Sequence, residues 1–265
     1  MTFAPTQLPR PAPIAKSRNM IAVASGKGGV GKTWFAITLS HALARSGRRT
    51  LLFDGDLGLA NVDIQLGLNA SQQDLAAVLS GRLTLSGAVK RFGRGGLDIV
   101  AGQSGSGKLA HVPTGRLQVL ISDLGTLAAA YDRVVLDIGA GVEQTVRLLA
   151  SQAGICAVVA TDEPTSLTDA YAFIKLTHFE RPGSDMRIVV NMASSTAEGE
   201  RTYQAISATC ERFLKISPPL LGVVRRDIRV REAIRNQEPL LSRFPASSAA
   251  CDLEAIAARL IASAV

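Results

Sequence analysis

Short apolar segments alternate along the chain with longer segments in which apolar residues recur every three or four positions. The apolar segments are typical of strands buried on both faces of a sheet, and the periodic ones of helices that pack on it. We expect strands over 20–25, 50–54, 97–100, 134–137, 155–160, 187–191 and 220–224. We expect helices over 32–45, 72–79, 117–130, 142–151, 167–179, 200–214, 230–236 and 249–263. This alternation predicts an α/β fold with a single, doubly wound, mostly parallel sheet and helices on both faces.

The first 18 residues differ from the rest of the chain. They hold four prolines and show no hydrophobic period, which is typical of an extended and flexible segment. From residue 19 to residue 265 the alternation continues without an internal repeat or a linker. We therefore expect a flexible proline-rich arm over 1–18 and one domain over 19–265.

The composition excludes two broad classes of protein. Of the 265 residues, 47% are hydrophobic and 19% are charged, which is too apolar for a disordered chain. Apolar runs such as 153–160 are much shorter than the ~20 residues of a membrane-spanning helix, and no signal peptide is recognisable. We therefore expect a cytoplasmic protein.

The net charge does not identify a partner, and the cysteines do not indicate a metal site. The formal net charge of +7 would suit nucleic acid, anionic lipid or an acidic protein, and it does not choose among them. Cys156, Cys210 and Cys251 are widely separated, without the paired spacing that holds zinc or an iron–sulfur cluster.

A phosphate-binding motif lies between the first predicted strand and the first predicted helix. Residues 26–33 read GKGGVGKT and satisfy G-x-x-x-x-G-K-[ST] in the strand-to-helix context that the motif requires. Glycines let consecutive backbone N–H groups face the phosphates, Lys32 neutralises their charge, and the Thr33 hydroxyl binds Mg²⁺. The predicted cofactors are ATP and Mg²⁺. The predicted nucleotide-binding residues of this loop are Gly26, Lys27, Gly28, Gly29, Val30, Gly31, Lys32 and Thr33.

Acidic residues follow two of the predicted strands. The segment LLFDGDLGLANVD ends a strand at Asp54 and carries Asp56, and RVVLDIGAG ends a strand at Asp137 before a glycine turn. A P-loop enzyme requires carboxylates at this edge of the sheet, because the metal ion and the attacking water bind there. We therefore place Asp56 and Asp137 in the catalytic site.

These motifs together resemble a known family. The loop KGGVGKT with its second lysine, DGDLGLAN and DIGAG are similar to the deviant Walker A ATPases of the MinD/ParA superfamily, over about residues 19–245. Within it, DGDLGLANVDIQLGL and TDEPTSLTDAYAFIK look most similar to the flagellar-number regulators called FlhG or FleN. The resemblance implies a MinD-like P-loop ATPase domain that forms a homodimer when ATP is bound and hydrolyses ATP slowly.

The resemblance also implies roles for individual residues. Lys27 would reach the phosphates in the partner subunit, Asp56 would orient the attacking water, and Asp137 would hold Mg²⁺ through water. The predicted catalytic residues are Lys27, Lys32, Asp56 and Asp137, and the predicted metal-binding residues are Thr33, Asp56 and Asp137.

The adenine base would bind on the other side of the loop. Asn191 resembles the asparagine that reads the adenine edge, and the segment 223–227, with Arg225 and Asp227, would wall the base.

The biological role implied by the resemblance is control of flagellar number or placement in a bacterium, with flagellar assembly or regulatory proteins as partners. Two alternatives stay open. The arginines between 225 and 235 would suit a ParA-like ATPase that partitions DNA or other cargo, and a nucleotide-dependent scaffold or transcriptional co-regulator would bind ATP without turnover. The final helix carries Arg259 as its only basic residue, so we expect it to pack on the core. Peripheral attachment at the inner membrane or the cell pole is left open.

Two further segments receive a structural interpretation. The stretch 102–108 nearly repeats the phosphate loop, but Leu109 has no hydroxyl for a metal, so we expect a mobile loop near the dimer face. Ser166 and Asp169 fit a capping box, and Glu143 suits the start of a helix without any catalytic duty.

Overall fold

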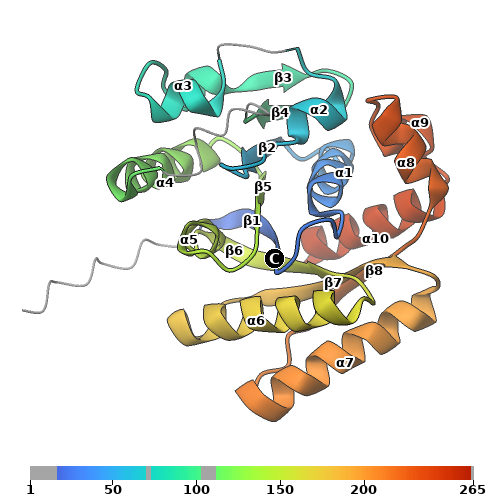
Figure 1. Cartoon of the computed structure of the whole chain (residues 1–265). Helices are drawn as coiled ribbons and strands as arrows, with labels where there is room; N and C mark the ends of the chain where they lie inside the picture. Colours follow the sequence, from blue (N-terminus) through green and yellow to red (C-terminus); the bar gives the residue numbers. More distant parts are fainter. Residues whose placement is uncertain (1–16, 70–72, 103–111, 264–265) are drawn as a thin grey trace, which may run out of the picture.

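The computed structural model describes residues 17–69, 73–102 and 112–263, which form an α/β fold around one sheet (Figure 1). Its strands are β1 (Ser17–Ser25), β2 (Thr50–Gly55), β3 (Lys90–Phe92), β4 (Leu97–Val100), β5 (Arg133–Ala140), β6 (Ala153–Ala160), β7 (Met186–Ala193) and β8 (Leu220–Arg225). They lie in the order β3-β4-β2-β5-β1-β6-β7-β8, and every neighbouring pair is parallel except β3 with β4. This sheet confirms the predicted fold class.

Helices cover both faces of the sheet, and each face has its own hydrophobic core. One face carries α1 (Lys32–Arg45), α2 (Val62–Leu66), α8 (Ile228–Arg235), α9 (Leu240–Arg243) and α10 (Ser248–Ala262). The other carries α3 (Leu75–Leu79), α4 (Thr114–Ala128), α5 (Gln144–Ala150), α6 (Pro164–Glu180) and α7 (Thr196–Leu214). Successive residues of β1 alternate between the cores: Ile21 and Val23 enter the first, Met20 and Ala22 the second. Burial on both faces explains the continuous apolar runs of the strands.

The short elements differ from the predictions. The hydrophobic pattern did not predict β3, α2, α9 and a single 3₁₀ turn over Ser86–Ala88, because three to five residues are too few to show a period. In addition, β1 begins at Ser17, two residues inside the predicted arm.

The start of α6 corrects the predicted capping box. This helix begins at Pro164, a residue whose fixed φ suits the first turn, and Ser166 therefore lies within the helix. The hydroxyl of Ser166 accepts a hydrogen bond from the backbone N–H of Thr161 instead of capping α6.

The register between β2 and β5 positions the acidic residues. Asp54 of β2 pairs directly with Asp137 of β5. On its other side, β5 pairs with β1, and the phosphate loop follows β1 in the sequence. Because these strands are parallel, their carboxyl ends meet at one edge of the sheet. The phosphate loop and both strand-end aspartates therefore share this edge.

Two predictions concern residues that the structure does not describe. The predicted arm up to residue 16 and the glycine-rich stretch 103–108 lie outside the described residues. Among the helices that are described, none combines the length and the apolar character needed to cross a membrane.

Candidate functional site

The phosphate loop joins the end of β1 to the start of α1, and its backbone requires glycine at two positions, Gly26 and Gly31. Gly31 precedes α1 with a φ of 83°, in the left-handed region that glycine adopts without steric cost. A Cβ on Gly26 would overlap the backbone carbonyl of Asp169 in α6. The glycines therefore let the loop curl tightly against α6 and direct the amino end of α1 at the site.

A buried ion pair lies at the base of the loop. The Nζ atom of Lys32 is 2.6 Å from Oδ1 of Asp137, and both side chains are almost completely removed from solvent. Burial raises the pKa of Asp137, and the charge of Lys32 and a hydrogen bond from Thr33 offset part of that shift. Removing one member of such a pair typically costs about 3–5 kcal/mol, because the other charge stays buried.

Asp137 and Thr33 fit the requirements of a magnesium ion that binds together with a nucleotide. The Oδ2 atom of Asp137 is buried and, within the described part of the chain, has no hydrogen-bond partner. Mg²⁺ prefers oxygen ligands and commonly takes one or two from the protein, with phosphate and water supplying the others. The described residues contain no group of three or more His, Cys, Asp or Glu side chains that could hold a metal ion. A site of this kind would therefore be completed by the nucleotide.

Asp54 lies next to Asp137 and is also completely buried. Its carboxylate accepts hydrogen bonds from the backbone N–H groups of Asp56 and Val62, each at 3.3 Å. Burial, and secondly the charge of Asp137, raise the pKa of Asp54 to about 7. At the sequence level Asp54 is identified only as the end of a strand. Its raised pKa could not be predicted, because it depends on burial in the folded protein and on the pairing of β2 with β5.

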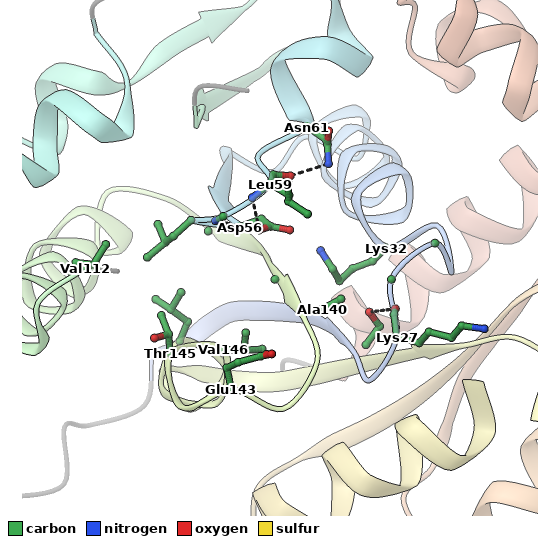
Figure 2. A pocket seen from close by; sticks show the side chains of 18 residues that line it. Lys27, Lys32, Asp56, Leu59, Asn61, Val112, Ala140, Glu143, Thr145 and Val146 are labelled. Carbon is green, nitrogen blue, oxygen red and sulfur yellow. Dashed lines mark hydrogen bonds between the residues drawn. The ribbon is translucent and has the colours of Figure 1, made fainter. Parts of the chain in front are cut away.

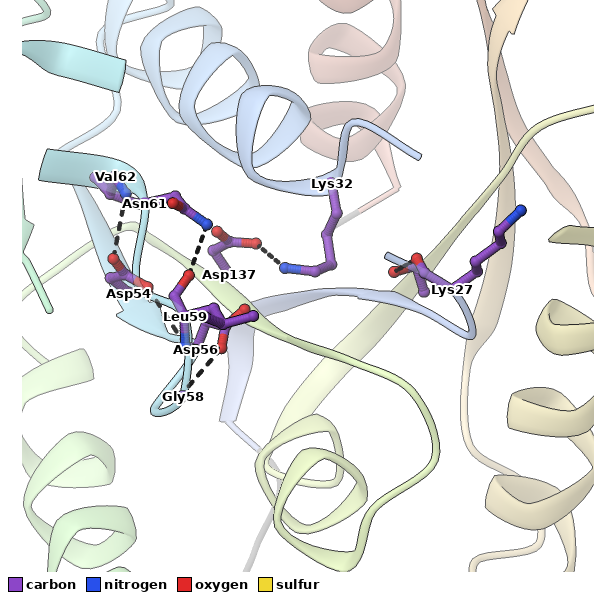
Figure 3. Close-up of polar contacts among 10 residues, drawn as sticks. Lys27, Lys32, Asp54, Asp56, Gly58, Leu59, Asn61, Val62 and Asp137 are labelled. Atoms are coloured by element: carbon purple, nitrogen blue, oxygen red, sulfur yellow. Dashed lines mark hydrogen bonds and ion pairs between the residues drawn. The ribbon is translucent and has the colours of Figure 1, made fainter. Parts of the chain in front are cut away.

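Asp56 lies on the loop after β2 and faces a cavity. Its Oδ1 atom accepts hydrogen bonds from the backbone N–H groups of Gly58 and Leu59, at 3.3 and 2.9 Å, which hold the carboxylate in place (Figure 3). The cavity has a volume of about 470 Å³ and lies between the phosphate loop, the loop after β2 and the start of α5 (Figure 2). Lys27, Lys32 and Asp56 line it, and their contacts with phosphates stay predictions.

Other residues of the cavity were missed or set aside at the sequence level. Thr145 lines it without belonging to any motif, and Asn61 lines it as the last residue of DGDLGLAN, for which no role was predicted. Glu143 lines it although it was interpreted only as a helix-start residue. Glu143 precedes α5, but its side chain forms no capping hydrogen bond. In the sequence, one feature indicated that Glu143 lies at this edge of the sheet: it comes shortly after Asp137 and the glycine turn that follows Asp137.

Lys27 lies at the rim of the cavity and extends away from Lys32 and Asp137 (Figure 3). Its Nζ atom is 2.8 Å from Oε2 of Glu163 and 2.8 Å from the hydroxyl of Thr165, where α6 begins. Lys27 lowers the pKa of Glu163 by a hydrogen bond and by its charge. The two lysines of the loop therefore point to different partners.

The three residues assigned to the adenine base lie outside the lining of this cavity. The amide of Asn191 donates to the carbonyl of Val30 at 2.8 Å and so supports the phosphate loop. Arg225 is bound to both carboxylate oxygens of Asp252, and Asp227 caps α8 through the N–H of Arg229. Their contacts with a base stay predictions.

The fold and the site together define the class of the protein. A glycine loop between a central strand and a helix, with a buried lysine and strand-end aspartates, is the site of a P-loop nucleotide-binding protein. The chain belongs to the family described as the CobQ/CobB/MinD/ParA nucleotide-binding domain, which matches residues 21–240. This match confirms the MinD/ParA resemblance.

Individual relatives are similar over most of their length. The antiactivator FleN of Pseudomonas aeruginosa is 38% identical over 241 residues, which cover 91% of this chain and 85% of FleN. The flagellum site-determining protein YlxH of Helicobacter pylori is 28% identical over 91% of this chain and 81% of its own. The structure of the septum site-determining protein MinD with Mg-ADP, from Pyrococcus horikoshii, shares the fold. It superposes with a TM-score of 0.78 at 24% identity, over 92% of this chain and 96% of MinD.

Proposed function

We propose that this protein is an ATP-dependent switch that dimerises around ATP, hydrolyses it slowly and regulates the number or placement of bacterial flagella. The observation that carries the proposal is the cavity in which Lys32, paired with buried Asp137, lies beside Asp56. These groups lie at the edge of a parallel sheet where nucleotides bind in folds of this kind. The similarity to FleN and to YlxH, a flagellum site-determining protein, supports the flagellar role.

The chemistry would depend on charge and position, with no covalent intermediate. Lys32 would hold the β- and γ-phosphates, and Asp56, which its backbone hydrogen bonds keep oriented, would position the attacking water. Thr33 and Asp137 would hold Mg²⁺, with Asp56 close by. When bound, Mg²⁺ neutralises phosphate charge.

Lys27 would connect two subunits. Its contacts with Glu163 and Thr165 are exposed, with side-chain exposures of 37% for Lys27 and 63% for Glu163, and exposed ion pairs stabilise little. Lys27 can therefore leave these partners at low cost when a second subunit presents a triphosphate. Homodimerisation would then follow from ATP binding, and hydrolysis would reverse it.

The adenine would lie beyond the loop, near Asn191 and the segment 223–227. Asn191 already contacts the phosphate loop through Val30, so a base bound there would be adjacent to the phosphates. Arg225 would help to shape this wall, since its charge is already paired with Asp252.

The test of this function is the hydrolysis of ATP by the variant Asp56→Ala. We expect the variant to bind ATP, to hydrolyse it about a hundredfold more slowly or worse, and to remain dimeric with ATP. The variant Asp123→Ala, at an exposed position of α4, serves as the matched control and should behave like the wild type. Hydrolysis by Asp56→Ala at the wild-type rate would show that the assigned role is wrong. Counting flagella per cell after deletion of the gene tests the biological role.

One observation supports a second candidate function, the partition of DNA. Arg231 and Arg235 are exposed on α8, and neither takes part in an ion pair among the described residues. A ParA-like partition ATPase would use such charges to hold DNA without sequence preference, and its affinity would fall steeply with salt. Binding to duplex DNA with a steep salt dependence that Arg231→Gln and Arg235→Gln abolish would favour partition over flagellar control.

A further inference from the structure

A second cavity lies at the edge of the sheet opposite to the phosphate loop. It has a volume of about 340 Å³ and is formed by the amino ends of β1, β5, β6 and β7 with the end of α10. Ile21, Ile155 and Leu260 provide apolar walls. Concave sites of this size, with apolar walls and a few polar groups, are typical of small-molecule binding.

Three arginines from three different strands meet in this cavity: Arg18 of β1, Arg133 of β5 and Arg187 of β7. Asp185 is the one carboxylate among the described residues that line it. It binds Arg187 through both of its oxygens, at 2.9 and 2.8 Å, and so neutralises that guanidinium. The charges of Arg18 and Arg133 remain, which gives the described lining of the cavity a formal charge of +2.

Arg133 is a partly buried cation without a carboxylate partner among the described residues. Among the described residues, its guanidinium donates only to backbone carbonyls, to that of Asp132 at 3.1 Å and to that of Leu260 at 3.4 Å. Burial, and secondly the charge of nearby Arg48, lower the pKa of Arg133 below its ordinary value, and the charge of the neighbouring Asp132 carboxylate offsets part of that shift. A guanidinium held in this way gains more from a bound anion than an arginine already in an ion pair.

An irregularity in the sheet places Arg18 at the rim of this cavity. The register between β1 and β6 shifts between Ser17 and Ile21, and the backbone of Arg18 crosses directly over Gly154. A Cβ at position 154 would lie 3.0 Å from the Cα of Arg18, so glycine permits this close crossing. The exposed side chain of Arg18 has no hydrogen-bond or ion-pair partner among the described residues.

We propose that this cavity binds the phosphate group of a small molecule, with Arg18 and Arg133 as the charged ligands. A phosphate monoester carries a charge of about −2 at neutral pH, which matches the charge that the two arginines leave unbalanced. The planar fork of arginine also suits phosphate oxygens. The hydroxyl of Ser263, which accepts a hydrogen bond from Arg187 at 3.2 Å, provides a further polar group. The site is separate from the phosphate loop, and the proposal does not rest on the proposed function.

The test uses the full-length protein, titrated with inorganic phosphate and with glycerol phosphate and followed by NMR of the backbone amides. Shifts of Gly154 and Ser263 report this cavity, whereas shifts of Gly29 and Gly31 report the phosphate loop, so binding at the two sites is distinguished. We expect saturable shifts of Gly154 and Ser263. Arg133→Gln and Arg18→Gln should each weaken this binding about tenfold or more. Acetate, with a single negative charge, should bind more weakly than phosphate.

The variant Arg116→Gln serves as the matched control, because it removes the same charge at an exposed position of α4 and should leave the binding unchanged. Arg18→Gln changes an exposed side chain, so its effect will not depend on a loss of folding. The proposal is overturned if phosphate shifts only Gly29 and Gly31. It is equally overturned if Arg116→Gln weakens the binding as much as the cavity variants.

Discussion

At the scale of residues, the two lysines of the phosphate loop have separate partners, Asp137 for Lys32 and Glu163 for Lys27. Lys32, Thr33 and Asp56 follow from motifs whose spacing specifies their chemistry, and the structure places Lys32 and Asp56 on one cavity. The partner of Lys27 could not be predicted, because Glu163 is 136 residues away and meets it only through the packing of α6 beside the loop. Local patterns identify functional groups, whereas their partners depend on tertiary contacts.

Asp54 gives rise to a prediction about pH. Its pKa is about 7 in the folded protein, well above the ordinary value of 3.8, so the folded state binds its proton more tightly than the unfolded state. The resulting stabilisation is present below about pH 4 and is lost as the pH rises to about 7. Asp54 should therefore lower the stability of the nucleotide-free protein over this interval by roughly 1.4 kcal/mol per unit of pKa shift. Burial lowers the pKa of His41 to about 4, so His41 changes the stability in the opposite direction over the same interval.

The variant Asp54→Asn removes this titration. Urea unfolding between pH 4 and 8 should show that the stability of the wild type falls relative to that of the variant as the pH rises, since His41 and the other titrating groups are common to both. Asp123→Asn, at an exposed position, should follow the wild type. Identical pH profiles for Asp54→Asn and the wild type would contradict the raised pKa.

At the scale of elements, the sequence predicted the long strands and helices and missed the short ones. Strands such as β1 and β5 are buried on both faces and read as continuous apolar runs, which makes them recognisable. The edge strand β3 has only three residues and pairs antiparallel with β4, so no alternation could develop. The order of the strands, and with it the meeting of Asp54 with Asp137, depends on long-range pairing that periodicity does not encode.

The contact between the phosphate loop and α6 leads to a prediction about two glycines. Gly26→Ala would place a methyl group against the backbone carbonyl of Asp169, which cannot move without displacing α6. We expect a loss of stability of about 1–3 kcal/mol in urea unfolding. Gly28→Ala is the control from the same loop, because a Cβ there has no neighbour within 4 Å. Equal stability of the two variants would show that the loop does not depend on this contact.

At the scale of the whole molecule, the proposed switch requires that a second subunit replace contacts within the first. Lys27 is the group through which this exchange would occur. In the background of Asp56→Ala, which preserves bound ATP, we expect Lys27→Ala to bind ATP but to remain monomeric in light scattering. Lys175→Ala, an exposed lysine of α6, should dimerise normally. Dimerisation of Lys27→Ala to the same extent as its parent would exclude the role of Lys27 between subunits.

The central claim is that the phosphate loop binds a magnesium nucleotide, and calorimetric titration of the purified protein with ATP and Mg²⁺ tests it most directly. We expect one ATP per chain, with an affinity that falls about a hundredfold or more in Lys32→Ala, provided that the variant is still folded. Folded wild-type protein that shows no saturable heat of ATP binding in the presence of Mg²⁺ would contradict the account.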